Sequence, residues 1–431
     1  MLRRFRVANH RSLRDEHELS LVATGADVPA ARPTGVRADG REIVVVPSVG
    51  IFGANASGKS NVLGAMRAMR AAILNSVAEW ARQEGVPREP FALDPRCHDQ
   101  TTLFEVDLLL GQSPVRHTYG FELSDDRIEA EWLHAYPHGR RQVWFDREAD
   151  RTDGGEEFRF PGEGLRGSKD GLVRLTRPNA LFLTVGATFN HPQLATVHRW
   201  FAENLELVSS GDDVTRRSTY TRGLLVDSRR APDYRERIES LLRVADLGIV
   251  GLDVDASLPD EQQVRLLHRS AAGDPIALDF TTQESLGTHA WFGFLGPVLH
   301  VLEHGFVLLA DELASSLHPV LAAEVVRLFQ DPGANPHGAQ LIFTTHDATL
   351  LGTGMVSRPL GRDQVWITTK HKTGETELYP LIDAHPRKDD NLERGYLRGR
   401  YGGIPRVSAG EMAREVARGV APVGGLVGGA A

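Results

Sequence analysis

The chain opens with apolar residues at every second position, first at Phe5 and Val7 and again at Leu19 and Leu21. Such alternation is typical of strands with one buried face. A polar turn over residues 9–12 separates the two runs. We therefore expect a strand, a turn and a returning strand at the start of the chain.

A strand, a glycine-rich segment and a helix are predicted between residues 43 and 74. Residues 43–46 are β-branched, and the apolar residues 49–52 lead directly into the glycine-rich segment 53–60. Beyond that segment apolar residues recur at helical spacing. They are Val62, Leu63, Met66, Met69, Ile73 and Leu74.

The apolar period returns to two between about residues 102 and 160, in runs separated by polar turns. We interpret this stretch as an antiparallel β meander. Residues 161–250 instead have mostly helical spacing, with one apolar stripe over residues 238–245.

From residue 280 strands and helices alternate, which is typical of an α/β domain. The predicted elements are a helix over 291–302, a strand over 306–310, a helix beginning at His318-Pro319, and strands over 340–345, 365–368 and 378–381. We expect an α/β fold with a mixed sheet, an antiparallel β meander and an inserted helical lobe. The predicted divisions are residues 1–160 and 276–405 for the two parts of the α/β head, 161–275 for the mostly helical lobe, and 406–431 for a disordered tail.

Composition is that of an ordinary globular protein. The 431 residues carry a net charge of −8 and one cysteine, Cys97, which excludes an internal disulfide and a cysteine-only metal site. No apolar run approaches the ~20 residues that span a bilayer. The N-terminus turns polar too early for a secretory signal, so a cytoplasmic protein without a membrane anchor is expected. The acidic balance argues against a generic DNA-coating protein.

The glycine-rich segment reads GANASGKS and matches the phosphate-loop pattern G-x-x-x-x-G-K-[ST]. The candidate nucleotide ligands are Gly53, Ala54, Asn55, Ala56, Ser57, Gly58, Lys59, Ser60 and Asn61. Backbone N–H groups would surround the phosphates, Lys59 would bring a positive charge to them, and Ser60 would offer its hydroxyl to Mg²⁺. The positive end of the following helix favours the same anion. ATP and Mg²⁺ are therefore the predicted cofactors.

Two apolar segments further along each end in residues suited to phosphate chemistry. FVLLADE, residues 306–312, ends in Asp311, which would hold Mg²⁺, and Glu312, which would accept a proton from the attacking water. Read alone, this acid pair is equally well explained as a helix N-cap. LIFTTHD, residues 341–347, places His346 at the end of a strand, where it would contact the γ-phosphate or position the water.

A fourth segment, ESLGT over residues 284–288, precedes the acidic strand and begins a helix. Ser285 and Gly287 could bind a phosphate there, although the segment read alone is a capping signal. The order of phosphate loop, Ser-x-Gly helix, Asp-Glu strand and histidine is the one that ABC ATPases show. The long interval between Lys59 and Asp311 also fits an inserted lobe.

Several longer segments together resemble the RloA-type ATPases, which are relatives of the OLD nucleases and of the RecF and SMC branch of ABC ATPases. They are VANHRSLRDEHELSL, GANASGKSNVLGAM, ESLGT, LLADELASSLHP, QLIFTTHD, RDQVWITTK and YLRGRYGGIP. They cover nearly all of the chain except the tail. The resemblance implies a P-loop NTPase fold of the ABC-ATPase type.

The same resemblance implies that two ATP molecules lie between two copies of the chain, arranged head to tail in a dimer or a higher oligomer. The residues implied to serve one ATP are Lys59, Ser60, Asp311, Glu312 and His346. Ser285 and Gly287 would face the nucleotide of the other copy, and Arg11 lies where relatives place residues close to the nucleotide. The residues implied to line the interface are Ser315, Ser316 and Leu317.

The sequence departs from the family pattern at several points. His10 stands where relatives usually carry an aromatic residue, and Leu286 stands where the signature commonly has aspartate. No glutamine loop is identified. The acids Asp383, Asp389 and Asp390 are not arranged like the TOPRIM metal site that OLD nucleases add. Nuclease activity is therefore not expected within this chain.

The leading expectation is a dimeric ATPase that acts as a nucleotide switch in bacterial anti-phage defence, beside a separate TOPRIM-type effector such as RloB. Direct binding of DNA or RNA stays open. The alternatives are a RecF-like DNA repair ATPase and a nucleotide-gated scaffold in which hydrolysis is incidental. An ABC transporter subunit is less favoured because the sequence lacks LSGGQ.

Overall fold

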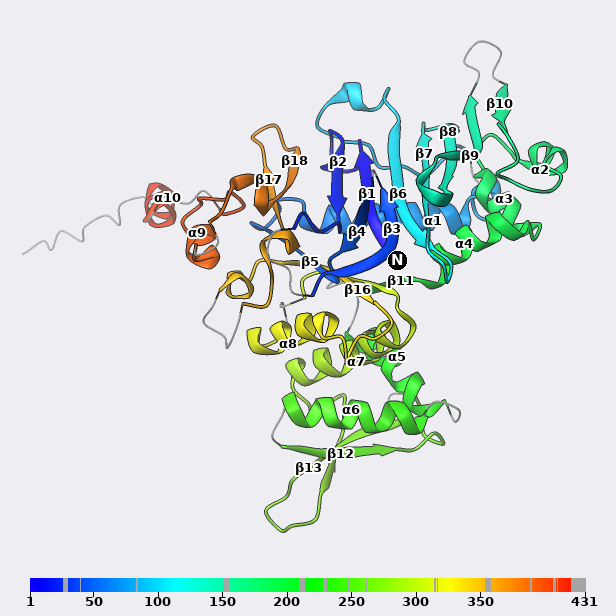
Figure 1. Ribbon diagram of the computed structural model, residues 1–431. Helices are drawn as coiled ribbons and strands as arrows, with labels where there is room; N and C mark the ends of the chain where they lie inside the picture. Colours follow the sequence, from blue (N-terminus) through cyan, green and yellow to red (C-terminus); the bar gives the residue numbers. More distant parts are fainter. Residues whose placement is uncertain are drawn as a thin grey trace, which may run out of the picture.

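Two β-sheets with a helix between them form the centre of the molecule (Figure 1). The computed structural model describes residues 1–25, 30–38, 40–82, 84–149, 155–208, 214–227, 231–245, 248–260, 262–313, 315, 317–352, 358–387, 390–405, 408 and 410–419.

One sheet is antiparallel and has the strand order β10-β9-β8-β7-β6-β1-β2. Its strands are β1 (Leu2–Ala8), β2 (His17–Ser20), β6 (Thr102–Leu110), β7 (Val115–Leu123), β8 (Ile128–Tyr136), β9 (Gln142–Ala149) and β10 (Glu156–Arg159). Phe5 lies opposite Leu19 on one side and Val106 on the other, so the alternating apolar residues share one face. The predicted N-terminal strand pair and the β meander are both confirmed, and they belong to the same sheet.

The other sheet has the order β11-β15-β16-β5-β17-β18, in which the first five strands are parallel and β18 is antiparallel. The strands are β11 (Leu205–Val208), β15 (Val307–Ala310), β16 (Gln340–Thr345), β5 (Ser48–Gly53), β17 (Val365–Lys370) and β18 (Thr376–Pro380). Every residue of β5, β15 and β16 is buried. Continuous apolar runs are typical of such central parallel strands, because both of their faces are covered.

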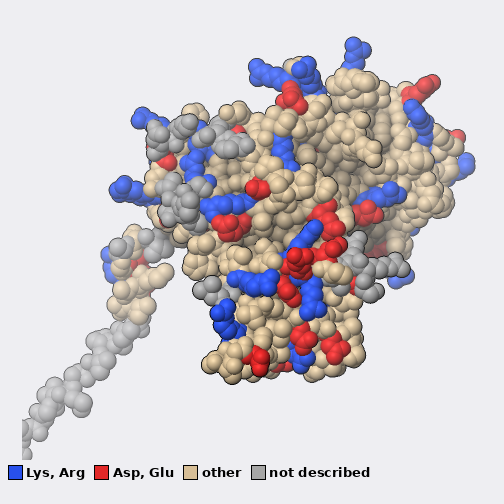
Figure 2. Space-filling view, turned by 60° about the horizontal axis from the view of Figure 1, so that its bottom comes forward, with Lys and Arg blue, Asp and Glu red and all other residues tan. Residues whose placement is uncertain are grey.

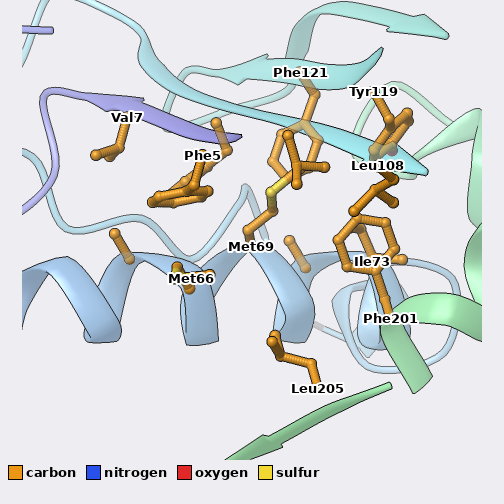
Figure 3. Close-up of a cluster of buried hydrophobic side chains, with 14 of the residues drawn as sticks. Phe5, Val7, Met66, Met69, Ile73, Leu108, Tyr119, Phe121, Phe201 and Leu205 are labelled. Carbon is orange, nitrogen blue, oxygen red and sulfur yellow. The ribbon is translucent and has the colours of Figure 1, made fainter. Parts of the chain in front are cut away.

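Helix α1 (Lys59–Asn75) begins within the glycine-rich segment and packs between the two sheets. Met66, Met69 and Ile73 of α1 pack on the antiparallel sheet side of the helix, in the same buried cluster as Phe5 and Phe121 (Figure 3). The helical spacing of the apolar residues after position 60 thus produces one continuous core. This core fixes the direction in which the N-terminus of α1 points.

Residues 161–250 contain the expected helices, but they do not form a purely helical insertion. The helices are α2 (Asp170–Leu175), α3 (Phe182–Thr188), α4 (Pro192–Glu203), α5 (Val214–Val226) and α6 (Ala231–Ala245). Between α4 and α5 the strand β11 joins the parallel sheet beside β15. A short apolar run such as LELV cannot be distinguished from a helical segment by its period, and this explains the missed strand.

A small antiparallel sheet follows α6 and was not expected from the sequence. Its strands are β12 (Ile249–Val254), β13 (Val264–His268) and β14 (Ile276–Leu278). With α6 it forms the lower part of the molecule in Figure 1. Figure 2 brings this part forward, and there acidic and basic side chains lie next to one another rather than in separate fields.

The remaining elements lie outside the two large sheets. They are the hairpin of β3 (Arg32–Ala38) and β4 (Arg41–Val45), helices α7 (Leu286–His304), α8 (Pro319–Gln330), α9 (Leu392–Leu397) and α10 (Glu411–Gly419), and the 3-10 helices η1 (Trp80–Arg82), η2 (Pro95–Cys97), η3 (Pro137–Gly139), η4 (Ala348–Leu351), η5 (Arg362–Gln364) and η6 (Leu381–Ala384). In the predicted tail, α10 replaces the expected disorder, and residues 420–431 lie outside the described part. None of the described helices is long and apolar enough to cross a membrane.

Candidate functional site

The predicted site residues follow three neighbouring parallel strands. The phosphate loop (residues 53–60) follows β5, Asp311 and Glu312 follow β15, and His346 follows β16. Since the carboxyl ends of parallel strands meet at one edge of a sheet, these segments lie together. The structure therefore brings together residues that are more than 250 positions apart in the sequence.

Glycine is required at two positions of the phosphate loop. Gly58 has a φ of +104°, and a Cβ there would lie 2.0 Å from Thr376 Oγ1. A Cβ on Gly53 would lie 2.2 Å from Thr368 Oγ1. Both distances are far below van der Waals contact, so any side chain would displace the loop.

Lys59 folds back across the mouth of the loop. Its ammonium donates hydrogen bonds to the carbonyl oxygens of Gly53 at 2.9 Å and Ala54 at 3.0 Å. Burial lowers the pKa of Lys59, while the nearby carboxylates of Glu312 and Asp311 act in the opposite direction. An anion in the loop can take over these two hydrogen bonds, because an ammonium group donates more strongly to a charged acceptor.

Asp311 connects the loop to the acidic strand. Ser60 Oγ donates a hydrogen bond to Asp311 Oδ1 at 2.9 Å, although 251 positions separate the two residues. A hydroxyl and a carboxylate at this distance match the protein ligands of Mg²⁺ in P-loop NTPases. Among the described residues no group of three or more His, Cys, Asp or Glu side chains could hold a metal. The hydroxyl of Ser60 and the carboxylate of Asp311 fit Mg²⁺ by their own chemistry, because this ion prefers oxygen ligands and usually keeps water and phosphate oxygens beside one or two protein groups.

Glu312 and His346 lie immediately beyond the ends of their strands. Glu312 is half-buried and has a φ of +54°, a left-handed conformation that side chains rarely adopt. Its backbone N–H donates to Thr344 Oγ1 at 2.8 Å. His346 is exposed one residue after β16. Backbone strain at a half-buried acid is common where a fold holds a functional side chain.

The signature segment (residues 284–288) is built into a different part of the surface. Ser285 caps the N-terminus of α7, and its hydroxyl accepts a hydrogen bond from Thr288 N–H at 3.1 Å. Ser285 and Gly287 line a cavity of about 210 Å³ with Leu317 and His318, and no phosphate-loop residue lines that cavity. Within the described part of one chain, the signature segment is therefore separate from the loop.

Arg11 lies beside α1 and forms an ion pair. Its Nε donates to Glu89 Oε2 at 2.7 Å, and this contact lowers the pKa of Glu89. A Cβ on Gly64, in the second turn of α1, would lie 3.3 Å from Arg11 Nη1. The guanidinium is thus near the phosphate loop but is held by a carboxylate, so the predicted contact with nucleotide would require this ion pair to open.

The structure describes only some of the remaining residues that the family resemblance singled out. Ser315 is exposed and Leu317 is buried, whereas Ser316 lies outside the described residues. Asp390 pairs with Arg400 at 2.9 Å, and Asp389 also lies outside the described part.

A network of hydroxyl groups around the loop was missed by sequence reasoning. Thr376 Oγ1 donates to the carbonyl of Ser57 at 2.8 Å and lies 2.7 Å from Ser12 Oγ. Asn61 Nδ2 donates to the same Ser12 oxygen at 2.6 Å, and Ser57 Oγ lies 2.6 Å from Thr368 Oγ1. The only available signal was that Ser12 and Thr368 lie in segments that resemble the family. The network joins the N-terminal turn and the strands β17 and β18 to the loop.

Comparison with solved structures found SMC heads at low similarity. The SMC head bound to the C-winged helix domain of ScpA is 12% identical, and the alignment covers 89% of this chain and 99% of that chain at a TM-score of 0.42. The SMC head domain from Thermotoga maritima is 11% identical, with coverage of 88% and 98% and a TM-score of 0.40. At these scores the likeness is distant. No curated protein matched the sequence.

Comparison with protein families gave a match over most of the chain. Residues 48–352 match the family described as "AAA domain, putative AbiEii toxin, Type IV TA system". The match begins at β5, just before the phosphate loop, and ends just after His346. It thus includes the loop, the signature segment and both acids. The chain belongs to this family of AAA domains.

Proposed function

We propose that the chain binds MgATP and hydrolyses it in a head-to-tail dimer, in which the signature segment of each copy completes the nucleotide site of the other. The observation that carries this proposal is the division of the site within one chain. Ser60 meets Asp311 at 2.9 Å beside Lys59 and Glu312, whereas Ser285 lies in a separate cavity. A second copy supplies what the first cannot bring to its own loop.

The residues of the loop half have separate roles in this proposal. Lys59 leaves the carbonyls of Gly53 and Ala54 and binds the terminal phosphates. Glu312 accepts a proton from the attacking water. Ser60 and Asp311 would hold Mg²⁺, which when bound would offset the negative charge that develops on the phosphates. Each of these groups is already within one chain, so nucleotide binding does not require the dimer.

The signature half and His346 act on the terminal phosphate. Ser285 and the N–H groups at the start of α7 approach it from the other copy. His346, exposed beyond β16, lies on the same edge of the sheet as the loop and positions the water or the γ-phosphate. Hydrolysis therefore follows closure of the dimer, and product release follows its opening.

We further propose that this cycle controls a separate effector in bacterial anti-phage defence, with a TOPRIM-type protein such as RloB as the partner. Two observations support a defence role: the family description refers to a toxin of a Type IV TA system, and the longer segments resemble RloA-type ATPases. ATP-dependent closure would present or withdraw a surface that the effector binds. A pull-down of the effector that depends on ATP would support this step.

The charges of the antiparallel sheet favour a protein effector over direct action on DNA. Arg4, Arg6 and Arg116 lie on the face that turns away from α1, and each pairs with a carboxylate. Asp107 and Glu105 are the main partners. DNA would have to compete with these ion pairs for the arginines. We therefore expect turnover that DNA does not stimulate, which separates this proposal from a RecF-like repair ATPase.

Mixing two inactive variants tests the composite site. Lys59→Ala removes the loop charge and Ser285→Arg blocks the signature, so each variant alone should lose ATP turnover. In mixed dimers the intact loop of one chain faces the intact signature of the other. Turnover should therefore return on mixing, measured as phosphate release.

The matched control mixes Lys59→Ala with Glu312→Gln, since both changes damage the loop half and no intact site can form. Glu312→Gln should bind ATP but lose roughly 10²–10⁴-fold in turnover. If mixed Lys59→Ala and Ser285→Arg dimers form but show no turnover, the head-to-tail site is wrong. Intact effector binding by Glu312→Gln would favour the scaffold alternative.

A further inference from the structure

Thr344 lies between the two acids and contacts both of them. It is fully buried in β16, one position before the end of the strand. Its hydroxyl donates to Asp311 Oδ1 at 2.6 Å and accepts from the backbone N–H of Glu312 at 2.8 Å. Its carbonyl oxygen accepts from Leu313 N–H at 3.0 Å. Thr344 thus makes hydrogen bonds to three consecutive residues, 311, 312 and 313, in the turn that contains both acids.

These contacts set the direction of each acid. Asp311 Oδ1 receives hydroxyl hydrogen bonds from both Ser60 and Thr344, which fixes the plane of the carboxylate. Glu312 is held at a φ of +54° by the hydrogen bonds on either side of its turn. A non-glycine residue stays in this conformation only where its surroundings impose it. Without the hydroxyl, the turn could relax and the glutamate would lose its orientation.

Threonine suits this position because a hydroxyl can donate and accept at once. Valine has the same shape and can do neither, whereas serine keeps both functions. The next residue, Thr345, makes a different contact, since its hydroxyl accepts from Asp347 N–H at 3.0 Å. The two threonines of the LIFTTHD segment are therefore not equivalent, and only Thr344 contacts the acids.

We propose that Thr344 is a positioning residue that orients Asp311 toward the metal and Glu312 toward the water. This inference rests on the proposed ATPase function of the site. Thr344 itself does not touch nucleotide in the proposal. It acts through the two acids, so its loss should reduce turnover and raise the Mg²⁺ concentration that turnover needs, without reducing the affinity for nucleotide.

The test compares Thr344→Val with Thr344→Ser in the full-length protein. For Thr344→Val we expect kcat to fall on the order of 100-fold, as for other small displacements of reacting groups. The Mg²⁺ concentration for half-maximal turnover should rise several-fold, and the Kd for ATP measured without Mg²⁺ should not change. Thr344→Ser should restore kcat to within a few-fold of wild type. A purely structural role would not produce this separation of kcat from Kd.

The control is Thr184→Val, which removes a buried hydroxyl that donates to Ile73 O at 2.6 Å, far from the acids in the sequence and on α3. Its kcat should match wild type. If Thr344→Val does not fold, Thr344→Cys keeps the size with a weak donor and should lose turnover in the same direction. Full turnover in Thr344→Val or Thr344→Cys would overturn the inference. Failure of the proposed function is a different result, because wild type would then not hydrolyse ATP at all.

Discussion

The two halves of the candidate site differ in how much of their structure one chain supplies. In the loop half (residues 53–61 with Asp311 and Glu312), polar groups are held by hydroxyls from three strands of the parallel sheet, β16, β17 and β18. In the signature half (residues 284–288), Ser285 bonds to Thr288 of its own helix, and Leu286 is 78% exposed. The loop half is therefore held in place within one chain, whereas the signature half faces solvent.

This difference fits the demands on each half. Phosphate and Mg²⁺ are bound by short, directional contacts, so the loop gains from a rigid setting that costs nothing when the ligand arrives. In the proposed dimer the signature segment has to reach a ligand on another copy, and an exposed helix end can do so after a rigid-body approach. The apolar side chain of Leu286 adds surface that a second copy could bury.

The largest effect on ATP binding should come from a substitution at the tightest contact of the loop half. In Gly58→Ala, the new Cβ would lie 2.0 Å from Thr376 Oγ1 at a φ of +104°. The loop must shift, and ATP affinity should fall by at least ~100-fold. Isothermal titration calorimetry with ATP measures this.

Gly223→Ala is the matched control for Gly58→Ala. Gly223 lies in α5, and a Cβ there meets nothing within 4 Å. Its ATP affinity should stay at the wild-type value. Normal affinity in Gly58→Ala would mean that the loop is not held by Thr376.

A smaller effect is expected in the signature half. Ser285→Ala removes the hydroxyl proposed to bind the phosphate of the other copy, so turnover should fall by about 10-fold, the value of one hydrogen bond to a charged group. The Kd for ATP of the separate chains should be unchanged. A parallel loss of affinity would show that Ser285 serves its own loop, and the comparison between the halves would fail.

The smallest effect is expected from a substitution of His10, in the N-terminal turn that supports the loop half. His10 is buried against Phe104, and neither ring nitrogen has a hydrogen-bond partner among the described residues. His10→Phe removes two unsatisfied polar atoms and should raise stability by about 1–3 kcal/mol. In a chain of this size we expect a rise of a few degrees in Tm, measured by calorimetry.

The increase in stability caused by His10→Phe should become larger as the pH falls. Burial, with a smaller effect of Arg11, lowers the pKa of His10 to about 4. The unfolded chain takes up a proton at its ordinary pKa of about 6.5, so wild type loses stability between about pH 6.5 and pH 4. The phenylalanine variant does not, and the Tm difference should widen from pH 7.5 to pH 5. A Tm difference that stays the same between pH 7.5 and pH 5 would contradict this account.

The sequence predicted the elements whose signal is local. The helix after Lys59 has a clear apolar period, and the phosphate loop and the continuous apolar runs before Asp311 and His346 carry recognisable motifs. Their contact in space followed from parallel strand geometry. Ser285 was found through its helix-capping position, although its separation from the loop required coordinates.

What the sequence could not predict are features that depend on distant partners. Thr344, Thr368 and Thr376 are ordinary strand residues in the sequence, and their role arises only where strands pair with the loop region. The strand β11 was missed because a strand of four residues carries no clear period, and its place in the sheet depends on β15. The small sheet of β12, β13 and β14 was missed because its short strands likewise carry no clear period.

The arrangement of the parallel sheet also has a consequence during protein synthesis. The glycine loop leaves the ribosome early, but β16 and β17, the strands on either side of β5, are made about 290 residues later. At ordinary translation speeds this delay is roughly 15–60 s. Throughout that interval the nascent chain has a phosphate-binding motif without the strands that shape it. A ribosome that stops before Thr376 therefore releases a chain whose loop lacks the hydrogen bond from the Thr376 hydroxyl to the carbonyl of Ser57.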